Sequence, residues 1–228
     1  MEAWNLWLRA ESERFADLLV GADFEARVPA CPDWNVRQLA HHLGVVQRYW
    51  AGNVRAADPA TRWWDESLET MPPDGELEQW MRQGSDLLLA ALADVDDTSP
   101  CRTWWGEPAT AGAVARHQVQ EAAVHRWDAE SALAEPAPID STAAADAVTE
   151  FVEIMVGERA GTLPGTVTLV SADTGGRWEV GGGSEAAVTL QAPASDLLLM
   201  LYERLPVDGA VVGERSLVDA LLAAVDTT

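Results

Sequence analysis

The chain has 228 residues, of which 48% are hydrophobic, and a formal net charge of −22. It is long enough to bury a substantial core as one large domain or two small ones. Because the acidic residues are spread along the whole chain, this charge argues against binding nucleic acid or an anionic membrane surface. The sequence shows no apolar run of the roughly 18 residues that a membrane helix needs and no signal peptide. Two cysteines are too few for a disulfide framework, so we expect a cytoplasmic protein with reduced thiols.

The first 135 residues contain four stretches whose apolar residues recur at helical spacing. Between the first two stretches, Pro29 and Pro32 exclude a helix, and Asn35 with Gln38 has the spacing of a capping box. Four amphipathic helices with long connections predict an antiparallel four-helix bundle. The expected helices span about 4–20, 36–54, 77–92 and 113–133.

The helical pattern ends at the proline-containing segment 134–138, where we place a domain boundary. The sequence then changes to an apolar period of two in short segments separated by glycines, which is typical of strands. We therefore predict an α+β protein with a helical domain over residues 1–135 and a smaller α+β domain over residues 139–228. The second domain is expected to contain helices over about 141–158, 194–204 and 216–224, and strands over 166–170, 177–180 and 187–190.

One pair in the fourth helix indicates a metal site. Glu121 and His125 are one helical turn apart, so both can reach one zinc-sized ion, although an isolated pair of this kind is more often a surface ion pair. His117 lies on the same stripe but about 12 Å from His125 along the axis, so these two converge poorly on one ion. The best third ligand is His42, because it lies on the packing face of the second helix, whereas His41 is expected on the solvent face.

Two histidines and one carboxylate would leave a coordination position open, as in a catalytic rather than a structural zinc site. We expect His117 to face solvent or to support the ligands, and Asp128 to be a supporting or salt-bridge partner. The paired tryptophans at 63–64 and 104–105 either cap the bundle core or wall a pocket for a large apolar or aromatic substrate.

Four segments of the chain resemble motifs of a known family. Residues 32–44, PDWNVRQLAHHLG, are similar to its first motif, and residues 116–130, which contain Glu121 and end in VHRWDAE, are similar to its second. In the second half, DTGGRW at 173–178 and ASDLLLMLYERLP at 194–206 resemble its C-terminal domain. On these motifs the chain resembles the mycothiol-dependent maleylpyruvate isomerases, within the DinB-like superfamily of metal-binding bundles.

The resemblance implies a DinB-like four-helix bundle followed by an SCP2-like domain. It implies that His42, Glu121 and His125 bind zinc, or another divalent metal, and that the thiol cofactor mycothiol takes the open position. A thiolate would add to a cis double bond conjugated with a carbonyl, and rotation and elimination would give the trans isomer. Arg204 matches an arginine of the family and is either a clamp for a substrate carboxylate or an ordinary cation at a helix C-terminus. We expect a monomer or weak dimer.

The departures from the family pattern are His117, Gln120 and Ala122, which flank the expected ligands. They leave three readings open. The chain is a zinc- and mycothiol-dependent isomerase or S-transferase acting on an electrophilic small molecule, a hydrolase-like enzyme using metal-bound water, or a non-catalytic protein that binds a metal or an apolar ligand. The sequence does not identify the substrate.

Overall fold

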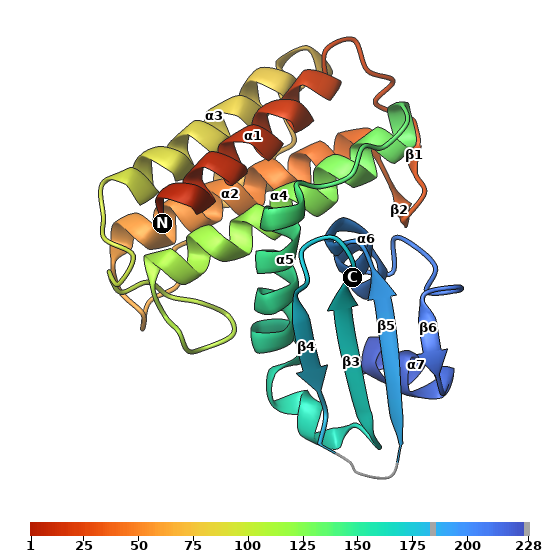
Figure 1. The fold of residues 1–228 in the computed structure, drawn as a ribbon. Coiled ribbons are helices and arrows are strands. Elements are labelled where there is room, and N and C mark those ends of the chain that lie inside the picture. Colours follow the sequence, from red (N-terminus) through yellow and green to blue (C-terminus); the bar gives the residue numbers. More distant parts are fainter. Residues whose placement is uncertain (183–185, 226–228) are drawn as a thin grey trace. The chain divides into compact units, whose positions relative to one another are not determined.

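The computed structural model describes residues 1–182 and 186–225, and of residue 158 it describes the backbone alone. The chain divides into two compact units, Met1–Ala137 and Pro138–Thr228. Helices and strands are mixed, so the predicted α+β class is confirmed, and Figure 1 shows the elements. The predicted domain boundary between residues 135 and 139 stays a prediction.

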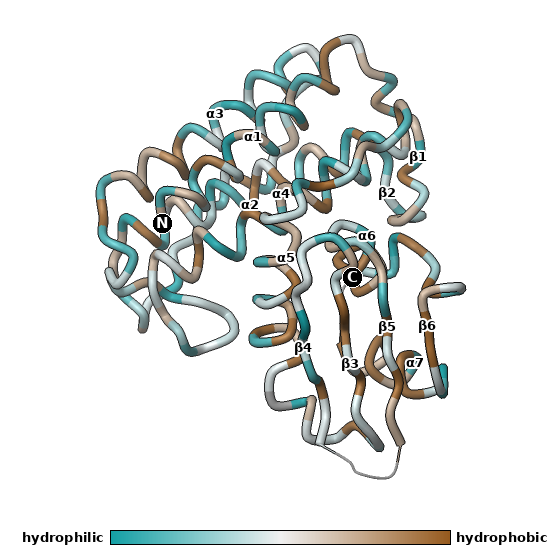
Figure 2. The backbone as a smooth tube through the Cα atoms, viewed as in Figure 1, coloured by the Kyte–Doolittle hydropathy of each residue, from teal (hydrophilic) through white to brown (hydrophobic). Residues whose placement is uncertain are grey.

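The first unit is a bundle of four long helices whose surfaces alternate between polar and apolar residues, as the teal and brown bands of Figure 2 show. This alternation lets each helix bury one face and expose the other. The buried core includes Phe15, Leu39, Leu43 and Met81, none of which is accessible to solvent. The helices are α1 (Glu2–Leu18), α2 (Val36–Ala56), α3 (Asp74–Ala93) and α4 (Ala111–Leu133).

The helix directions differ from the prediction of an antiparallel bundle. Arg37 and Arg55 on α2 contact Asp74 and Leu87 on α3 in the same sequence order, so α2 and α3 run parallel. The α1 and α4 helices also run parallel, because ion pairs join residue 11 to 126 and residue 14 to 130. The antiparallel prediction was wrong because the connection 57–73 is long enough to return along the bundle before α3 begins.

A buried ion-pair network fixes α4 to α1. The Arg126 side chain is inaccessible to solvent, and its guanidinium donates to Glu11 and Glu130 at 2.7 Å each. Arg126 also donates to the carbonyl of Ala137, and Glu130 accepts from the backbone N–H of Ala137. Because a buried charge is costly without such partners, this network holds both α4 and the chain that leaves it in one position.

The second unit contains a four-stranded sheet in the order β4-β3-β5-β6. The central strands β3 and β5 are parallel, and the outer pairs are antiparallel. The three predicted strands are present as β3 (Thr166–Ser171), β4 (Arg177–Val180) and β5 (Ala187–Ala192); β6 (Val211–Gly213) was not predicted. The predicted helix 141–158 ends as an α-helix at residue 150 and continues as a π-helical turn. The helices of this unit are α5 (Ser141–Glu150), η2 (Phe151–Val156), η3 (Gly157–Thr162), α6 (Ala194–Leu201) and α7 (Arg215–Ala223).

Candidate metal centre

The start of α2 determines which way its two histidines point. The Asn35 side chain accepts from the backbone N–H of Gln38, and the Gln38 side chain accepts from the backbone N–H of Asn35, both at 3.0 Å, so the predicted capping box is present. Before it, β1 (Arg27–Val28) and β2 (Cys31–Asn35) form a short hairpin. The hairpin brings the Trp34 ring to 4.8 Å from that of His42.

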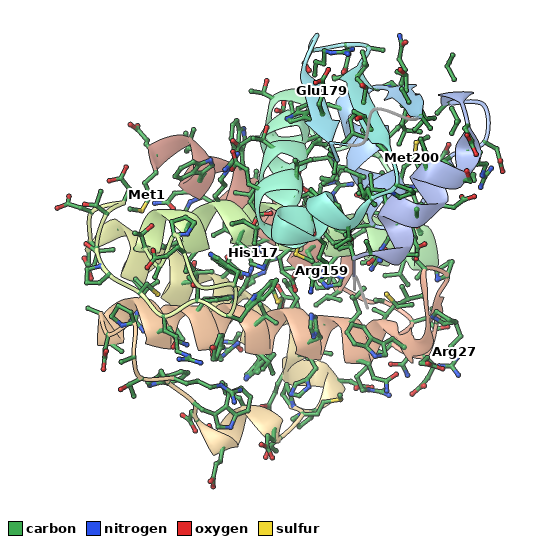
Figure 3. All side chains as sticks on the ribbon, turned by 90° about the horizontal axis from the view of Figure 1, so that it is seen from below. Met1, Arg27, His117, Arg159, Glu179 and Met200 are labelled. Carbon is green, nitrogen blue, oxygen red and sulfur yellow. The ribbon has the colours of Figure 1, made fainter. Side chains whose placement is uncertain are left out.

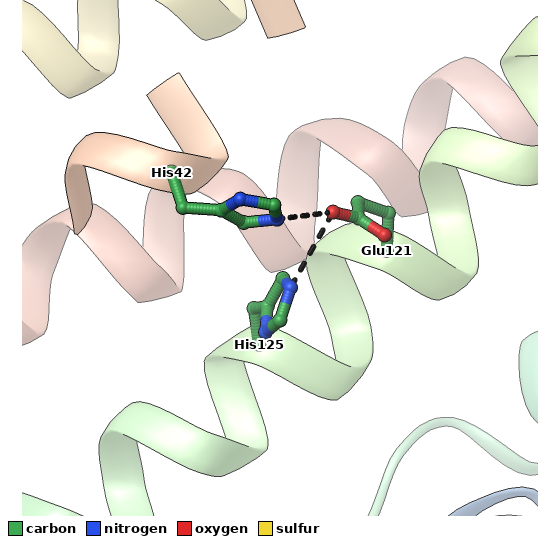
Figure 4. A group of neighbouring side chains, drawn as sticks. All are labelled: His42, Glu121 and His125. Atoms are coloured by element: carbon green, nitrogen blue, oxygen red, sulfur yellow. Dashed lines mark hydrogen bonds and ion pairs between the residues drawn. The ribbon is translucent and has the colours of Figure 1, made fainter. Parts of the chain in front are cut away.

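The three residues expected to bind metal lie together in the bundle, as Figure 4 shows. His42 Nε2 lies 3.1 Å and His125 Nε2 lies 3.4 Å from Glu121 Oε1. One ligand atom from each residue lies within 4.8 Å of the others. Two imidazole nitrogens and a carboxylate oxygen this close can converge on a single divalent ion.

A second carboxylate supports this cluster from behind. His125 Nδ1 lies 3.1 Å from Asp128 Oδ2, and the Asp128 side chain is inaccessible to solvent. With Nδ1–H donating to Asp128, Nε2 is the ring nitrogen that faces Glu121 and would bind an ion, which is the usual arrangement of a metal-binding histidine. Asp128, which was expected to be a supporting or salt-bridge partner, thus contacts one of the expected ligands. The sequence argument missed Cys31, whose thiol donates to the same Asp128 oxygen at 3.9 Å.

The charges of the cluster are strongly coupled. Burial favours the neutral form of the Glu121 carboxyl, but the imidazoles of His125 and His42 outweigh burial and hold its pKa well below the usual value. Burial likewise opposes protonation of His125, but the carboxylates of Glu121 and Asp128 raise its pKa to about 9. Without an ion, a proton on His125 therefore compensates the buried carboxylates. A divalent cation would supply the same compensation, so the donor set fits a metal.

The neighbouring His41 does not belong to this cluster, and the prediction that it faces solvent was wrong. Its ring is half-buried and stacks on Trp80 with 5.4 Å between ring centroids, and its Nε2 donates to the carbonyl of Leu68 at 3.0 Å. Arg48 is also buried, with its guanidinium carbon 3.9 Å from the centre of the Trp80 ring. The connection 57–73 and α3 cover this face, which the pattern of α2 alone could not indicate.

His117 is buried, with 7% of its surface exposed, so the solvent-facing one of its two expected roles was wrong, and a supporting role stays a prediction. Its ring contacts three indoles, and its Nδ1 accepts from the Gln120 amide at 3.2 Å. Figure 3 labels its position on the ribbon. His117 lies outside the group of ligand atoms around Glu121.

Arg204 belongs to the second compact unit and follows α6, which ends at residue 201 rather than at 204 as predicted. Its Nη1 donates to the carbonyl of Tyr202 at 2.8 Å, and its guanidinium carbon lies 5.9 Å from the Tyr202 ring. It is half-buried. This contact with a carbonyl at the end of a helix is compatible with the reading of Arg204 as a helix C-terminal cation.

The comparisons with known proteins agree with this fold. The family model described as the mycothiol maleylpyruvate isomerase N-terminal domain matches residues 8–130. Two crystal structures, of the mycothiol-dependent maleylpyruvate isomerase and of its histidine-to-alanine mutant, are similar in fold, with TM-scores of 0.68 and 0.69. Each covers 93% of this chain and of its own chain at 13% identity. No curated protein matches the chain in sequence.

Because the family model covers more than half of the sequence, the chain belongs to the family of the mycothiol maleylpyruvate isomerase N-terminal domain. This membership identifies the chain as an enzyme. Within the described residues, none of the helices combines the length and the apolar character required to cross a bilayer.

Proposed function

We propose that the chain is a zinc- and mycothiol-dependent enzyme that acts on an electrophilic small molecule by isomerisation or S-transfer. The observation that carries this proposal is the convergence of His42, Glu121 and His125 within 4.8 Å, backed by Asp128. Zinc, or another divalent ion in this donor set, would supply a Lewis acid that keeps a bound thiol deprotonated at neutral pH.

The helices that supply the three residues, and the exposure of their side chains, indicate what the site can do. His42 reaches the cluster from α2 and the other two ligands from α4, so the cluster depends on the packing of two helices. The side chains of His42 and Glu121 are 35% and 21% exposed, which leaves this side of the cluster accessible to a thiol and a substrate. His125 is 10% exposed and is held from behind by Asp128. An accessible side and a supported side are what a catalytic metal site requires.

The thiol requirement is tested with the metal-loaded protein. We expect turnover of a cis-configured, electron-poor alkene conjugated with a carbonyl, such as maleylpyruvate, to depend on added mycothiol. Mycothiol should also raise the melting temperature of the metal-loaded protein and leave that of the His42→Ala variant unchanged. Turnover without any thiol would favour the hydrolase-like alternative, in which bound water is the nucleophile. A protein without bound metal and without a mycothiol-induced shift would favour the non-catalytic alternative.

We also propose that Arg204 binds the negative charge of an anionic substrate. This proposal rests on the match between Arg204 and the family's arginine and on the excess of acidic over basic residues in the first 135 residues. Truncating one partner of a desolvated arginine–carboxylate contact costs roughly 2–5 kcal/mol. We therefore expect Arg204→Ala to lower kcat/KM for an anionic substrate by at least tenfold, with metal content unchanged.

The matched control for Arg204→Ala is Arg177→Ala, since Arg177 lies in the same unit and forms an exposed ion pair with Glu179. That variant should keep the full kcat/KM. Equal activity of the two variants would leave Arg204 with the role of a helix C-terminal cation.

A further inference from the structure

A connected series of aromatic rings lies on α2, on α4 and in the two loops that flank α3. We call it the aromatic band, and its members are Tyr49, Trp50, Trp64, Trp104, Trp105 and His117. Successive rings are in contact, with centroids 6.3 Å apart for Trp64 and Tyr49, 5.0 Å for Tyr49 and Trp50, and 5.5 Å for Trp50 and Trp105. Trp105 then lies 4.8 Å from His117 and 5.3 Å from Trp104.

The sequence spacing places the band beside the cluster. His117 is four residues before Glu121 on α4, so the two side chains are neighbours on one face of the helix. Tyr49 is seven residues after His42 on α2, two turns along the same face. Both helices that supply the metal ligands therefore also supply members of the band, and a molecule bound at the cluster would meet the band next.

The loop between α3 and α4 holds two of the tryptophans in place. Pro100 and Thr110 form a bridge across its base, and the backbone N–H of Cys101 donates to Ala109 at 2.9 Å. The indole N–H of Trp105 donates to the carbonyl of Pro108 at 3.2 Å, so the polar end of that ring is satisfied within the loop. The ring faces are left for apolar contacts.

Two of the indoles are exposed despite this support. Trp104 is 56% exposed and Trp64 is 38% exposed, whereas Trp50 is 2% exposed and belongs to the core. The alternative that these loops only cap the bundle does not explain why Trp64 and Trp104 are exposed. An exposed indole that continues into further contacting rings, as Trp104 does into Trp105, is more typical of an interaction site than an isolated exposed indole.

The charges near the band indicate what it would bind. The amide of Gln120 donates to His117 Nδ1 at 3.2 Å. Arg62 lies over Tyr49 and Trp64, 5.6 and 5.1 Å from their ring centres, at the other end of the series. At the end of the band next to the cluster, the contacting rings of Trp104, Trp105 and His117 offer ring faces for apolar contacts.

From this arrangement we propose that the aromatic band is a subsite for a planar apolar group, an aromatic ring or an extended conjugated chain, attached to the electrophilic part of the substrate. The proposal rests on the proposed function, because it assigns a substrate class to the same site. It separates this chain from an enzyme whose substrate carries only carboxylates and carbonyls. The band would hold the apolar group by stacking while the electrophilic carbon lies at the cluster.

The test is equilibrium binding of two probes to the zinc-loaded full chain by calorimetry. Cinnamate and crotonate share an unsaturated carboxylate, but cinnamate carries a phenyl ring where crotonate carries a methyl group. We expect cinnamate to bind at least tenfold more tightly. Trp105→Leu should weaken cinnamate binding roughly three- to tenfold, which is the range of one aromatic contact, and change crotonate binding less than twofold.

Trp104→Leu is the second variant, because a residue that is 56% exposed can be changed with little effect on folding. It should also weaken cinnamate selectively. The control is Trp7→Leu, a half-buried indole on α1 outside the band, which should leave both probes unaffected. Absence of a preference for cinnamate, or an equal loss for both probes in the two band variants, would overturn the proposal.

Metal content and the mycothiol-induced thermal shift are measured on the same samples. If these fail while the preference for cinnamate persists and depends on Trp104 and Trp105, the proposed thiol chemistry is wrong and the subsite stands. If metal and mycothiol bind as expected and the preference is absent, the subsite is wrong and the proposed chemistry stands.

Discussion

On α2, His41 and His42 are adjacent in sequence but face different helices, and the two faces satisfy their polar groups in different ways. On the α3 side, His41 and Arg48 donate to backbone carbonyls and contact the ring of Trp80 between them. Each donor there has a neutral acceptor, and burial lowers the pKa of both side chains. This face needs no further ligand.

On the α4 side, His42 meets Glu121 and His125, and these side chains contact one another. The carboxylates of Glu121 and Asp128 raise the pKa of His125 there, and the neighbouring imidazoles hold the pKa of the Glu121 carboxyl low. The comparison shows that burial alone does not distinguish a structural histidine from a ligand. What distinguishes them is whether the surrounding acceptors are neutral carbonyls or carboxylates.

The largest expected effect comes from replacing His42 and His41 by alanine in two separate variants. His42→Ala should lower zinc affinity by more than 100-fold, since losing a ligand must cost more than the 10–100-fold that follows loss of an outer partner. His41→Ala should keep the full metal content but lower the melting temperature, because it removes a ring stacked on Trp80. Metal analysis after gel filtration and thermal melts measure both. Equal loss of metal from the two variants would contradict the difference between the faces.

The second-largest expected effect is the dependence of zinc affinity on pH. His125 must lose its proton before Nε2 can bind an ion, and its pKa in the metal-free site is about 9. Zinc affinity should therefore rise by about tenfold per pH unit up to that value, or roughly 100-fold from about pH 6 to pH 8. Competition with a chelator of known pH dependence measures this. A flat profile over that range would mean that no proton on His125 competes with the ion.

The same raised pKa has the opposite consequence for the metal-free fold. The protonated His125 contributes to the free energy of unfolding. This contribution is fully present below the ordinary histidine pKa of about 6.5 and is lost as pH rises through about 9. The metal-free protein should therefore become less stable over the range in which it binds zinc more tightly.

The smallest effect concerns the α3 face. A Cβ on Gly44 would overlap the Trp80 ring, so Gly44→Ala should lower the free energy of unfolding by about 1–3 kcal/mol and leave metal content unchanged. Gly75→Ala is the control, because a Cβ there meets nothing within 4 Å and alanine favours a helix. Urea unfolding measures both. Loss of zinc from Gly44→Ala would show that the two faces of α2 are coupled.

Much of the fold follows from local patterns. The helices of the bundle, the capping box at Asn35 and the strands β3, β4 and β5 were predictable because helix and strand periods and caps involve residues close in sequence. The directions of α2 and α3 were not, since a connection of 17 residues permits either direction. The burial of His41 and His117 was also missed, because loops and helices distant in sequence cover them.

For the cluster, the sequence by itself determined that Glu121 and His125 share one face of α4, because the geometry of a helix turn places residues four apart side by side. The apolar pattern that follows the cap at Asn35 also determined that His42, rather than His41, lies on the packing face of α2 that was expected to supply the third ligand. Only the tertiary structure decided that these faces meet, with the ligand atoms within 4.8 Å. Only the tertiary structure placed Trp34 and Cys31 beside the cluster and joined the tryptophans of two loops to it as the aromatic band. The physical reason is that such contacts depend on how helices pack and on where long connections lie, and neither is encoded within a single turn of helix.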